Sequence, residues 1–253
     1  MRIGLVIGKK NSTGLPGKNT RLILGRPAAE YAFIAGSYAQ LDKLYVSTDS
    51  DEIANIGKKY GATHIPRPAE LATPDALTED ALTHAYQHIL SNIKGQKITA
   101  ISLLFCNNPA IDVGKLNEAL DFIEGTTEYD SCFSVAKYDM FSPNRARRID
   151  ENGEIQPFVD HSLLGEFSSI RNSQGSVYFC DLSIQVMKPC CFEKMDEGRL
   201  PFKWQGKRSK AMTVDFGFDI DTDWQVAVIE YWLKQKGFTE HSTPWEKKVV
   251  CLK

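Results

Sequence analysis

The chain has 253 residues, of which 42% are hydrophobic and 25% charged, a composition typical of a globular protein with a substantial core. Its formal net charge is −2, and the lysines near its start are too local to form a nucleic-acid face, so we expect no nucleic-acid partner. No apolar run approaches the roughly 18 residues that would cross a bilayer, and the run at 3–7 is far shorter than a signal-peptide core. We therefore expect a cytoplasmic protein with no membrane partner, built as a single domain over residues 1–253.

A polar loop at residues 8–19 follows that apolar run and gathers lysines, asparagines and glycines in one turn. Glycine lets the backbone turn its N–H groups toward a ligand, and lysine supplies positive charge against phosphate oxygens. A stretch with helical periodicity follows at 27–39, so the loop would join a strand to a helix. The pattern predicts a phosphate-binding loop, and the alternative is a solvated basic hairpin loop.

Two common phosphate motifs do not fit this loop. A P-loop needs a glycine five residues before its Gly-Lys pair and a hydroxyl residue after it, but Ser12 and Asn19 occupy those places. The dinucleotide fingerprint fails because no glycine stands two residues before Gly14. A phosphate-binding role would therefore belong to a different family of loops.

Short apolar runs, rich in β-branched and aromatic residues, alternate with stretches of helical periodicity along most of the chain. The alternation predicts an α/β fold with right-handed crossovers, a mostly parallel sheet and helices on both faces. Ligands bind such sheets at the C-terminal ends of the strands, where the loop at 8–19 would lie. The expected strands are at 3–7, 44–47, 98–104, 131–135 and 176–179, and the expected helices at 27–39, 51–60, 78–93, 113–124 and 222–236.

One stretch, from 137 to about 173, breaks the alternation and is polar, with a basic cluster at 145–148. An Asn-Gly pair between Ile149 and Ile155 predicts a β-hairpin there. Whether the stretch is an interface or a long surface loop stays open, since loops of this length are often mobile. Residues 237–253 are polar and carry no clear assignment, as a tail or as an edge strand.

Two acidic residues, Asp219 and Asp221, end an apolar run that begins near Met212. Residues two apart on an extended strand point to the same side, so the pair could hold a divalent cation. Oxygen ligands favour Mg²⁺ or Mn²⁺, which keep waters and bridge to substrate phosphates. The alternative is that Asp221 or Asp223 caps the helix that starts at Trp224.

Cysteine and histidine do not predict a metal site or a disulfide framework. The two histidines at helical spacing, His84 and His88, lack the glutamate of a zinc protease motif and are expected to be surface or packing residues. The cysteines have no C-x-x-C spacing and are expected to be buried free thiols. They are Cys106, Cys132, Cys180, Cys190, Cys191 and Cys251.

Five segments, taken in order, resemble the cytidylyltransferases that activate acidic sugars, the CMP-sialic acid and CMP-Kdo synthetase family. The first is Lys9-Lys-Asn-Ser-Thr-Gly-Leu-Pro-Gly-Lys-Asn19, which is similar to that family's signature A-R-x-x-S-K-G-x-P-x-K-N. The others resemble its second strand, its nucleotide-binding block, its Asn-Gly strand and its metal-binding carboxylates. They are Ser47-Thr-Asp-Ser-Asp-Glu-Ile-Ala54, Arg67-Pro-Ala-Glu-Leu-Ala72, Gln174-Gly-Ser-Val-Tyr178 and Phe218-Asp-Ile-Asp221.

The resemblance implies a Rossmann-like, three-layer nucleotide-diphospho-sugar transferase fold. It also implies that residues 137–175 form a protruding arm that contacts a second subunit, so a homodimer is expected. The implied reaction transfers CMP from CTP to the anomeric hydroxyl of an acidic keto-sugar, a nonulosonate or a Kdo-like sugar, and releases pyrophosphate. Catalysis would rest on alignment and charge neutralisation, with Mg²⁺ or Mn²⁺ as cofactor.

The same resemblance assigns roles to individual residues. Lys9, Lys18, Asp219 and Asp221 would be catalytic, with the two aspartates holding the metal. Arg67 and the backbone around Ala76 would read the cytosine, although an arginine before a proline could equally be a plain surface residue. The nucleotide-binding set implied is Lys9, Asn11, Ser12, Lys18, Asn19, Arg67, Ala76 and Asn107.

This sequence departs from the family pattern at several of these positions. Lys9 replaces an arginine and Thr13 replaces a lysine, so one positive charge is lost near the leaving group. Phe105 stands where a glutamine is common, and Asn107 where a threonine or aspartate is common. The alternatives are therefore a nucleotide-sugar pyrophosphorylase that uses UTP or GTP, a glycosyltransferase, or a nucleotide-binding relative without activity. The sequence does not select the sugar.

Overall fold

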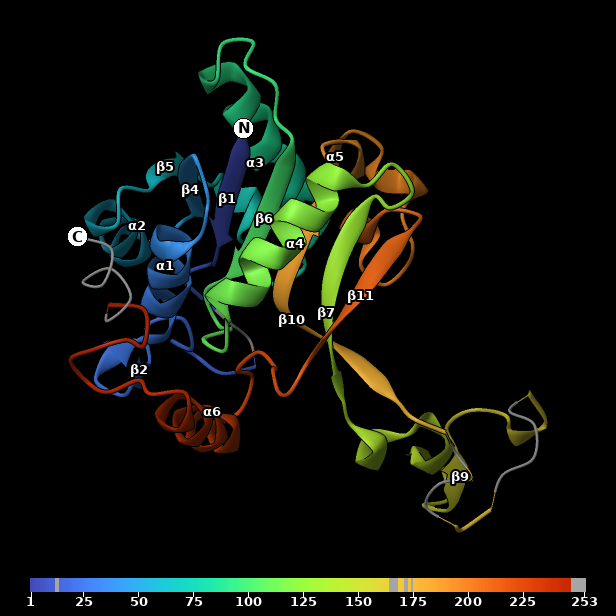
Figure 1. The fold of residues 1–253 in the computed structure, drawn as a ribbon. Coiled ribbons are helices and arrows are strands. Elements are labelled where there is room, and N and C mark those ends of the chain that lie inside the picture. The colour runs from blue at the N-terminus through green and yellow to red at the C-terminus, as the bar shows by residue number, and fades with distance from the viewer. Residues whose placement is uncertain (12–13, 164–167, 171–172, 174, 247–253) are drawn as a thin grey trace.

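The fold is a seven-stranded mixed sheet between two layers of helices, in the order β11-β7-β10-β6-β1-β4-β5 (Figure 1). The computed structural model describes residues 1–11, 14–163, 168–170, 173 and 175–246. Every strand pair in the sheet is parallel except those made by β10, which runs antiparallel to both β6 and β7. The mostly parallel α/β sheet predicted from the alternating pattern is confirmed.

The strands of this sheet are short and mostly buried, as the apolar runs predicted. In register, Ile7 at the end of β1 lies between Ser47 of β4 and Phe105 of β6, so three parallel strands end at one edge. The loops that follow these strands therefore meet there. The strands are β1 (Arg2–Ile7), β4 (Lys43–Thr48), β5 (Thr63–Pro66), β6 (Ala100–Phe105), β7 (Ser131–Lys137), β10 (Tyr178–Met187) and β11 (Ser209–Val214).

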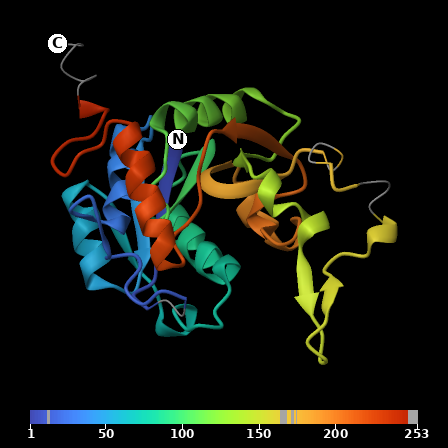
Figure 2. The same ribbon diagram turned by 90° about the horizontal axis from the view of Figure 1, so that it is seen from below.

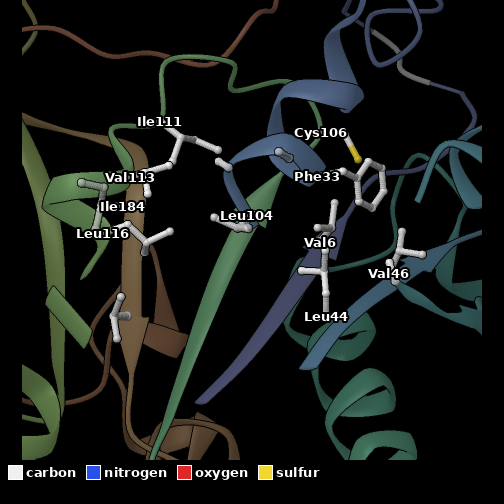
Figure 3. Close-up of a cluster of buried hydrophobic side chains, with 14 of the residues drawn as sticks. Val6, Phe33, Leu44, Val46, Leu104, Cys106, Ile111, Val113, Leu116 and Ile184 are labelled. Atoms are coloured by element: carbon white, nitrogen blue, oxygen red, sulfur yellow. The ribbon is translucent and has the colours of Figure 1, made fainter. Parts of the chain in front are cut away.

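Helices cover both faces of the sheet. On one face α1 (Ala28–Tyr38), α2 (Asp51–Lys59) and α4 (Val113–Gly125) bury a cluster that includes Phe33, Val46, Leu104 and Leu116 (Figure 3). On the other face α3 (Thr78–Asn92) and α5 (Cys190–Glu193) bury a second cluster. Short 3₁₀ turns are η1 (Ala69–Leu71), η2 (Asp139–Phe141), η3 (Pro143–Arg145), η4 (His161–Leu163), η6 (Met195–Glu197) and η7 (Lys203–Gln205).

A third apolar cluster joins the two ends of the chain. It packs α6 (Asp223–Gln235) against α1 and the small ladder of β2 (Leu22–Ile23) and β3 (Arg26–Pro27), as the views in Figures 1 and 2 show. Leu15 from the loop after β1 and the fully buried Ile220 belong to this same cluster. Their burial brings the start of the chain next to the segment around Asp219.

The predicted elements agree closely with the observed ones, with three corrections. The strand expected at 176–179 is β10, which begins at Tyr178 and runs on to Met187. Strands β5 and β11 were not predicted. Because β11 ends at Val214, Asp219 and Asp221 lie in the loop before α6. The expectation that an extended strand sets their common direction is therefore wrong.

The described residues between β7 and β10 project from the body as an arm (Figures 1 and 2). The predicted hairpin is confirmed: β8 (Arg147–Ile149) pairs antiparallel with β9 (Ile155–Pro157). The turn between them contains Gly153 at φ +82°, a conformation that glycine adopts without strain. Gln174, the first residue of the Gln174–Tyr178 segment, lies outside the described residues.

The described cysteines, which exclude Cys251, are free, and three of them are buried. Burial raises the pKa of the Cys106 thiol to about 12, as expected for a packing residue. His84 and His88 are half-buried on α3, consistent with packing roles. In the described part of the chain, no helix has the length and apolar character required to span a bilayer. The C-terminal residues 247–253 lie outside the described part.

Candidate nucleotide site

A cavity of about 200 Å³ opens where β1 and β6 end, and it collects most of the residues predicted for the site. It lies at the C-terminal edge of parallel strands, the edge where α/β sheets bind ligands. Side chains from the start, middle and end of the chain meet there. The predicted residues that line it are Lys9, Lys18, Asn19, Arg67, Ala76, Asn107 and Asp219.

The basic loop, defined here as residues 8–11 and 14–19, is held by its own backbone turns. The Asn19 side chain donates to the Lys9 carbonyl at 2.8 Å, and the Asn19 carbonyl accepts from Ala29 N–H at 2.8 Å. Gly17 has φ +70°, and a Cβ on Gly8 would lie 2.5 Å from Cys106 Sγ. Glycine is thus required where the loop leaves β1 and where it turns back.

The lysines of the basic loop have different surroundings. Lys9 Nζ donates to the carbonyl of Thr73 at 3.1 Å, across the cavity wall. Lys18 Nζ forms an ion pair with Asp221 at 2.5 Å, although 203 residues separate them in sequence. Asn11 lines a neighbouring cavity and not the one that holds the lysines. Ser12 and Thr13 lie outside the described residues.

The acidic loop, defined here as residues 217–221, faces the basic loop. Asn107 Nδ2 donates to Asp219 Oδ2 at 3.0 Å, and the Asn107 carbonyl accepts from Ile220 N–H at 2.8 Å. Burial raises the pKa of Asp219, the charge of Asp221 raises it further, and Lys18 opposes both. The two carboxylates therefore lie close enough to interact electrostatically, even though they do not share a strand.

The alternative role for Asp221 or Asp223 was that of a cap on α6. The N-cap of α6 is Thr222, whose N–H donates to Gln225 Oε1 at 2.7 Å in a capping box. Asp223 lies in the first turn and pairs with Arg21 at 2.6 Å. Neither Asp221 nor Asp223 caps the helix, so this alternative is wrong.

The donor set of the acidic loop fits a divalent cation. The two carboxylates carry negative charge, and burial together with the charge of Asp221 raises the pKa of Asp219. A bound cation would neutralise this charge. Among the described residues, no group of three or more His, Cys, Asp or Glu side chains gathers in one place. Asp219 and Asp221 would thus need further oxygen ligands from phosphate or water, which is how Mg²⁺ is commonly held.

Arg67 is half-buried and directed back at the sheet. Its Nη2 donates to the Ser47 carbonyl at 2.8 Å and its Nε to Ser47 Oγ at 3.3 Å. Burial lowers the pKa of Arg67, and the nearby Asp49 partly opposes this effect. Ala76 lines the same cavity, and its N–H donates to the Thr73 carbonyl. Arg67 is therefore not a plain surface residue.

A second cavity of about 700 Å³ adjoins the first through Arg67. It lies over the ends of β4 and β5 and is lined by Thr48, Asp49, His64 and Thr73, among others. Thr48 and Asp49 belong to the second-strand segment named in the resemblance, and they lie at the end of a parallel strand, where ligands bind. His64 and Thr73 were not predicted; His64 lies within β5, and Thr73 lies in the segment between η1 and α3.

A family model described as cytidylyltransferase matches residues 3–152, more than half of the chain. The chain belongs to this cytidylyltransferase family. Among curated relatives, N-acylneuraminate cytidylyltransferase of Escherichia coli O18:K1:H7 is 27% identical over 65% of this chain and 36% of its own length. CMP-N,N'-diacetyllegionaminic acid synthase of Legionella pneumophila is 29% identical over 70% of this chain and 77% of its own. The chain thus spans about a third of the first relative and three quarters of the second.

Solved structures agree with this cytidylyltransferase at the level of the fold. CMP:2-keto-3-deoxy-manno-octonic acid synthetase, complexed with CTP, superposes with a TM-score of 0.63 at 12% identity, covering 92% of this chain and 98% of its own. A 4-diphosphocytidyl-2C-methyl-D-erythritol synthase from Anaerococcus prevotii gives a TM-score of 0.61 at 13% identity, covering 92% and 96%. Both support the Rossmann-like nucleotidyltransferase fold that was predicted.

Proposed function

We propose that this chain is a CTP-dependent CMP-sugar synthetase that transfers CMP from CTP to the anomeric hydroxyl of an acidic keto-sugar and releases pyrophosphate. The observation that carries the proposal is the meeting of the basic and acidic loops at one cavity: Lys18 and Asp219 line it, and Lys18 pairs with Asp221, which is not among the lining residues, at 2.5 Å. The family membership and the named activities of the relatives support the same reaction.

In this proposal the basic loop binds the triphosphate. Lys18 and Lys9 neutralise phosphate oxygens, and the N–H groups of the loop turn toward them. The sugar hydroxyl attacks the α-phosphorus in line and its proton passes to solvent, while the bond to the pyrophosphate oxygen breaks. The protein aligns the two reactants and balances the developing charge, which is the main catalytic device in such transfers.

Asp219 and Asp221 would hold Mg²⁺ or Mn²⁺, as their carboxylate oxygens are suited to do. When bound, the cation supplies charge neutralisation for the phosphates. Asn107 fixes the orientation of Asp219 through its 3.0 Å hydrogen bond. Because Lys18 already pairs with Asp221, this lysine would move to the phosphates when the metal and the nucleotide bind.

The cytosine would be read around Arg67 and Ala76, with Asn19 facing the nucleotide and Asn11 at the rim of the second cavity. Arg67 is fixed by Ser47, which gives a rigid edge for base recognition. A pyrophosphorylase specific for UTP or GTP remains the competing function, because few residues discriminate among the bases. Ranking CTP, UTP, GTP and ATP by thermal shift separates these, and CTP should stabilise the protein most.

The arm supports a homodimer, with residues 137–175 contacting the second copy. It exposes large apolar side chains that the body of the protein does not cover, and such patches mark interaction sites. Sedimentation should give a dimer, and Ile149→Glu with Ile155→Glu should shift it toward monomer. The exposed side chains are Met140, Phe141, Ile149, Ile155, Phe158, Leu163 and Ile170.

The direct test combines CTP, Mg²⁺ and a panel of acidic sugars that includes sialic, legionaminic, pseudaminic and Kdo-type acids. We expect pyrophosphate only when CTP and one of these sugars are present together, and mass spectrometry should then detect the CMP conjugate. A panel that yields neither product would overturn the proposal. CTP binding without any turnover would instead favour the inactive nucleotide-binding relative.

Phe105 offers a separate test of that inactive alternative. The ring lines the cavity and packs edge-on against Trp204, with ring centroids 6.5 Å apart. If a missing glutamine limits the activity, Phe105→Gln should raise the rate. If Phe105 instead belongs to the working pocket, the same variant should lower the rate and leave CTP binding in place.

A further inference from the structure

The acidic loop lies between the end of β11 at Val214 and the start of α6 at Asp223, outside the sheet and the helix. Its position therefore depends on neighbouring parts of the chain. Asn107 holds its later half, as described above. Its first residue, Gly217, contacts Tyr138: the phenol Oη donates to the Gly217 carbonyl at 3.2 Å and lies 3.5 Å from Gly217 N–H.

A buried carboxyl group also lies against Gly217. Asp181 on β10 is 3% exposed, and a Cβ built on Gly217 would lie 2.1 Å from Asp181 Oδ2. Gly217 is therefore close to both this carboxyl group and the Tyr138 hydroxyl. A side chain at position 217 would force one of them to move, and with it the backbone that leads to Asp219.

Tyr138 is also the first residue after β7, at the root of the arm. Its N–H donates to the Val177 carbonyl at 2.9 Å, which ties the outgoing and returning strands of the arm together. Its ring packs against Phe141 and Phe179, with centroids 5.9 and 6.4 Å away. Burial raises the pKa of Tyr138, so the phenol keeps its proton near neutral pH and remains a donor.

We propose that Tyr138 is a positioning residue that fixes the acidic loop from the root of the arm, and so sets the geometry of Asp219 and Asp221 for a divalent cation. Gly217 is two residues from Asp219, so a shift at Gly217 is carried along the backbone to the carboxylates. The part of the proposal that concerns the cation rests on the proposed function. The part that concerns the loop does not.

The variant Tyr138→Phe removes only the hydroxyl and keeps the ring packed against Phe141 and Phe179. Its matched control is Tyr60→Phe, which removes a hydroxyl that donates from the end of α2 to Glu30 on α1 at 2.6 Å. The control loses one hydrogen bond, and Tyr138→Phe loses the bond to the Gly217 carbonyl and the longer contact with Gly217 N–H. A general loss of stability would affect them alike, whereas a positioning role affects only Tyr138→Phe.

Hydrogen–deuterium exchange without ligand tests the loop directly. Peptides that cover residues 215–222 should exchange faster in Tyr138→Phe than in the unaltered protein. Their exchange rate in Tyr60→Phe should equal that of the unaltered protein. Equal exchange rates in all three proteins would overturn the proposal, regardless of which substrate the protein acts on. This measurement needs neither metal nor substrate, so its failure is distinct from a failure of the proposed function.

Binding of Mn²⁺, followed by electron paramagnetic resonance in the presence of CTP, tests the consequence for the carboxylates. Tyr138→Phe should raise the dissociation constant about 3- to 10-fold, the weight of one partly buried hydrogen bond, with Tyr60→Phe unchanged. In turnover, the Mg²⁺ concentration at half-maximal rate should rise while the KM for CTP changes little. Unaltered Mn²⁺ affinity in Tyr138→Phe would refute the role in metal geometry.

Discussion

The basic loop and the acidic loop face the same cavity, but different parts of the chain hold them. Neighbours within the loop and the next helix fix the basic loop, as the bonds of Asn19 to Lys9 and Ala29 show. Distant side chains fix the acidic loop, namely Asn107 from the end of β6 and Tyr138 from the root of the arm. The backbone of the basic loop is therefore held both by nearby residues and by tertiary contacts, such as Lys10 N–H to Asp49 Oδ1 at 2.7 Å, whereas the bonds that hold the acidic loop come from distant side chains.

From this difference we expect the largest loss of activity when a carboxylate of the acidic loop is replaced. Asp219→Asn should lower kcat/KM for CTP by about a thousandfold or more, because a half-buried carboxylate ligand is removed at the point of metal and phosphate contact. Steady-state pyrophosphate release measures it. The control is Asp215→Asn, a change at an exposed carboxylate whose partner is Lys236 at 3.5 Å, and it should leave the rate unchanged. Similar losses in both variants would contradict the assignment.

On the basic side, Lys18→Ala should cost about a hundredfold in kcat/KM, and Lys18→Arg less, because an ammonium opposite the phosphates is one of several positive groups there. Lys236→Ala, at an exposed lysine directly after α6, serves as the control. A loss larger than that of Asp219→Asn would reverse the ranking of the two sides.

The close packing of the basic loop against the end of β6 is tested through stability. Gly8→Ala would place a Cβ 2.5 Å from Cys106 Sγ, and overpacking of this kind typically costs about 1–3 kcal/mol. The melting temperature should fall by about 2–10 °C. Gly125→Ala is the control, because a Cβ there meets nothing within 4 Å. If both variants melt alike, close packing does not explain the glycine at position 8.

The smallest expected effect is a gain in stability at the acidic loop. Burial and the charge of Asp221 raise the pKa of Asp219 above its ordinary value, so the folded state binds the proton of this carboxyl group more tightly than the unfolded state does. Stability from this group is present below the unfolded pKa and is lost as pH rises through the folded pKa. Asp219→Asn removes that loss. Its melting temperature should exceed that of the unaltered protein by roughly 1–3 °C near pH 7 and by less near pH 4.

Local pattern was sufficient to predict most of the sheet and the basic loop. Strands such as β1 and helices such as α2 have apolar spacing that matches their period. Strand β10 was predicted only in part, because the polar residues Asp181, Ser183 and Gln185 interrupt its apolar pattern while lying buried. Strand β11 lies at the edge of the sheet and begins with Ser209 and Lys210, so the sequence indicated only an apolar run that begins near Met212.

The acidic side of the site was predicted by residue but not by geometry. Asp219 and Asp221 were expected to share a face of a strand, whereas their neighbours across the fold place them in a loop. Nothing near Tyr138 or Gly217 in the sequence indicates that they touch, because 79 residues separate them and neither belongs to a local motif. Contacts of this kind depend on the packed structure.

The ion pair between Lys18 and Asp221 affects how charged ligands, a triphosphate or a divalent cation, bind in the site. A triphosphate that attracts the ammonium leaves the carboxylate without its counterion, and a divalent cation that attracts the carboxylate leaves the ammonium unbalanced. Binding of either the nucleotide or the cation alone thus leaves one protein charge without a counterion. Binding of both leaves the Lys18 ammonium paired with phosphate and the Asp221 carboxylate paired with the cation. The nucleotide and the cation should therefore bind with positive cooperativity, and each should raise the affinity of the protein for the other by the same factor.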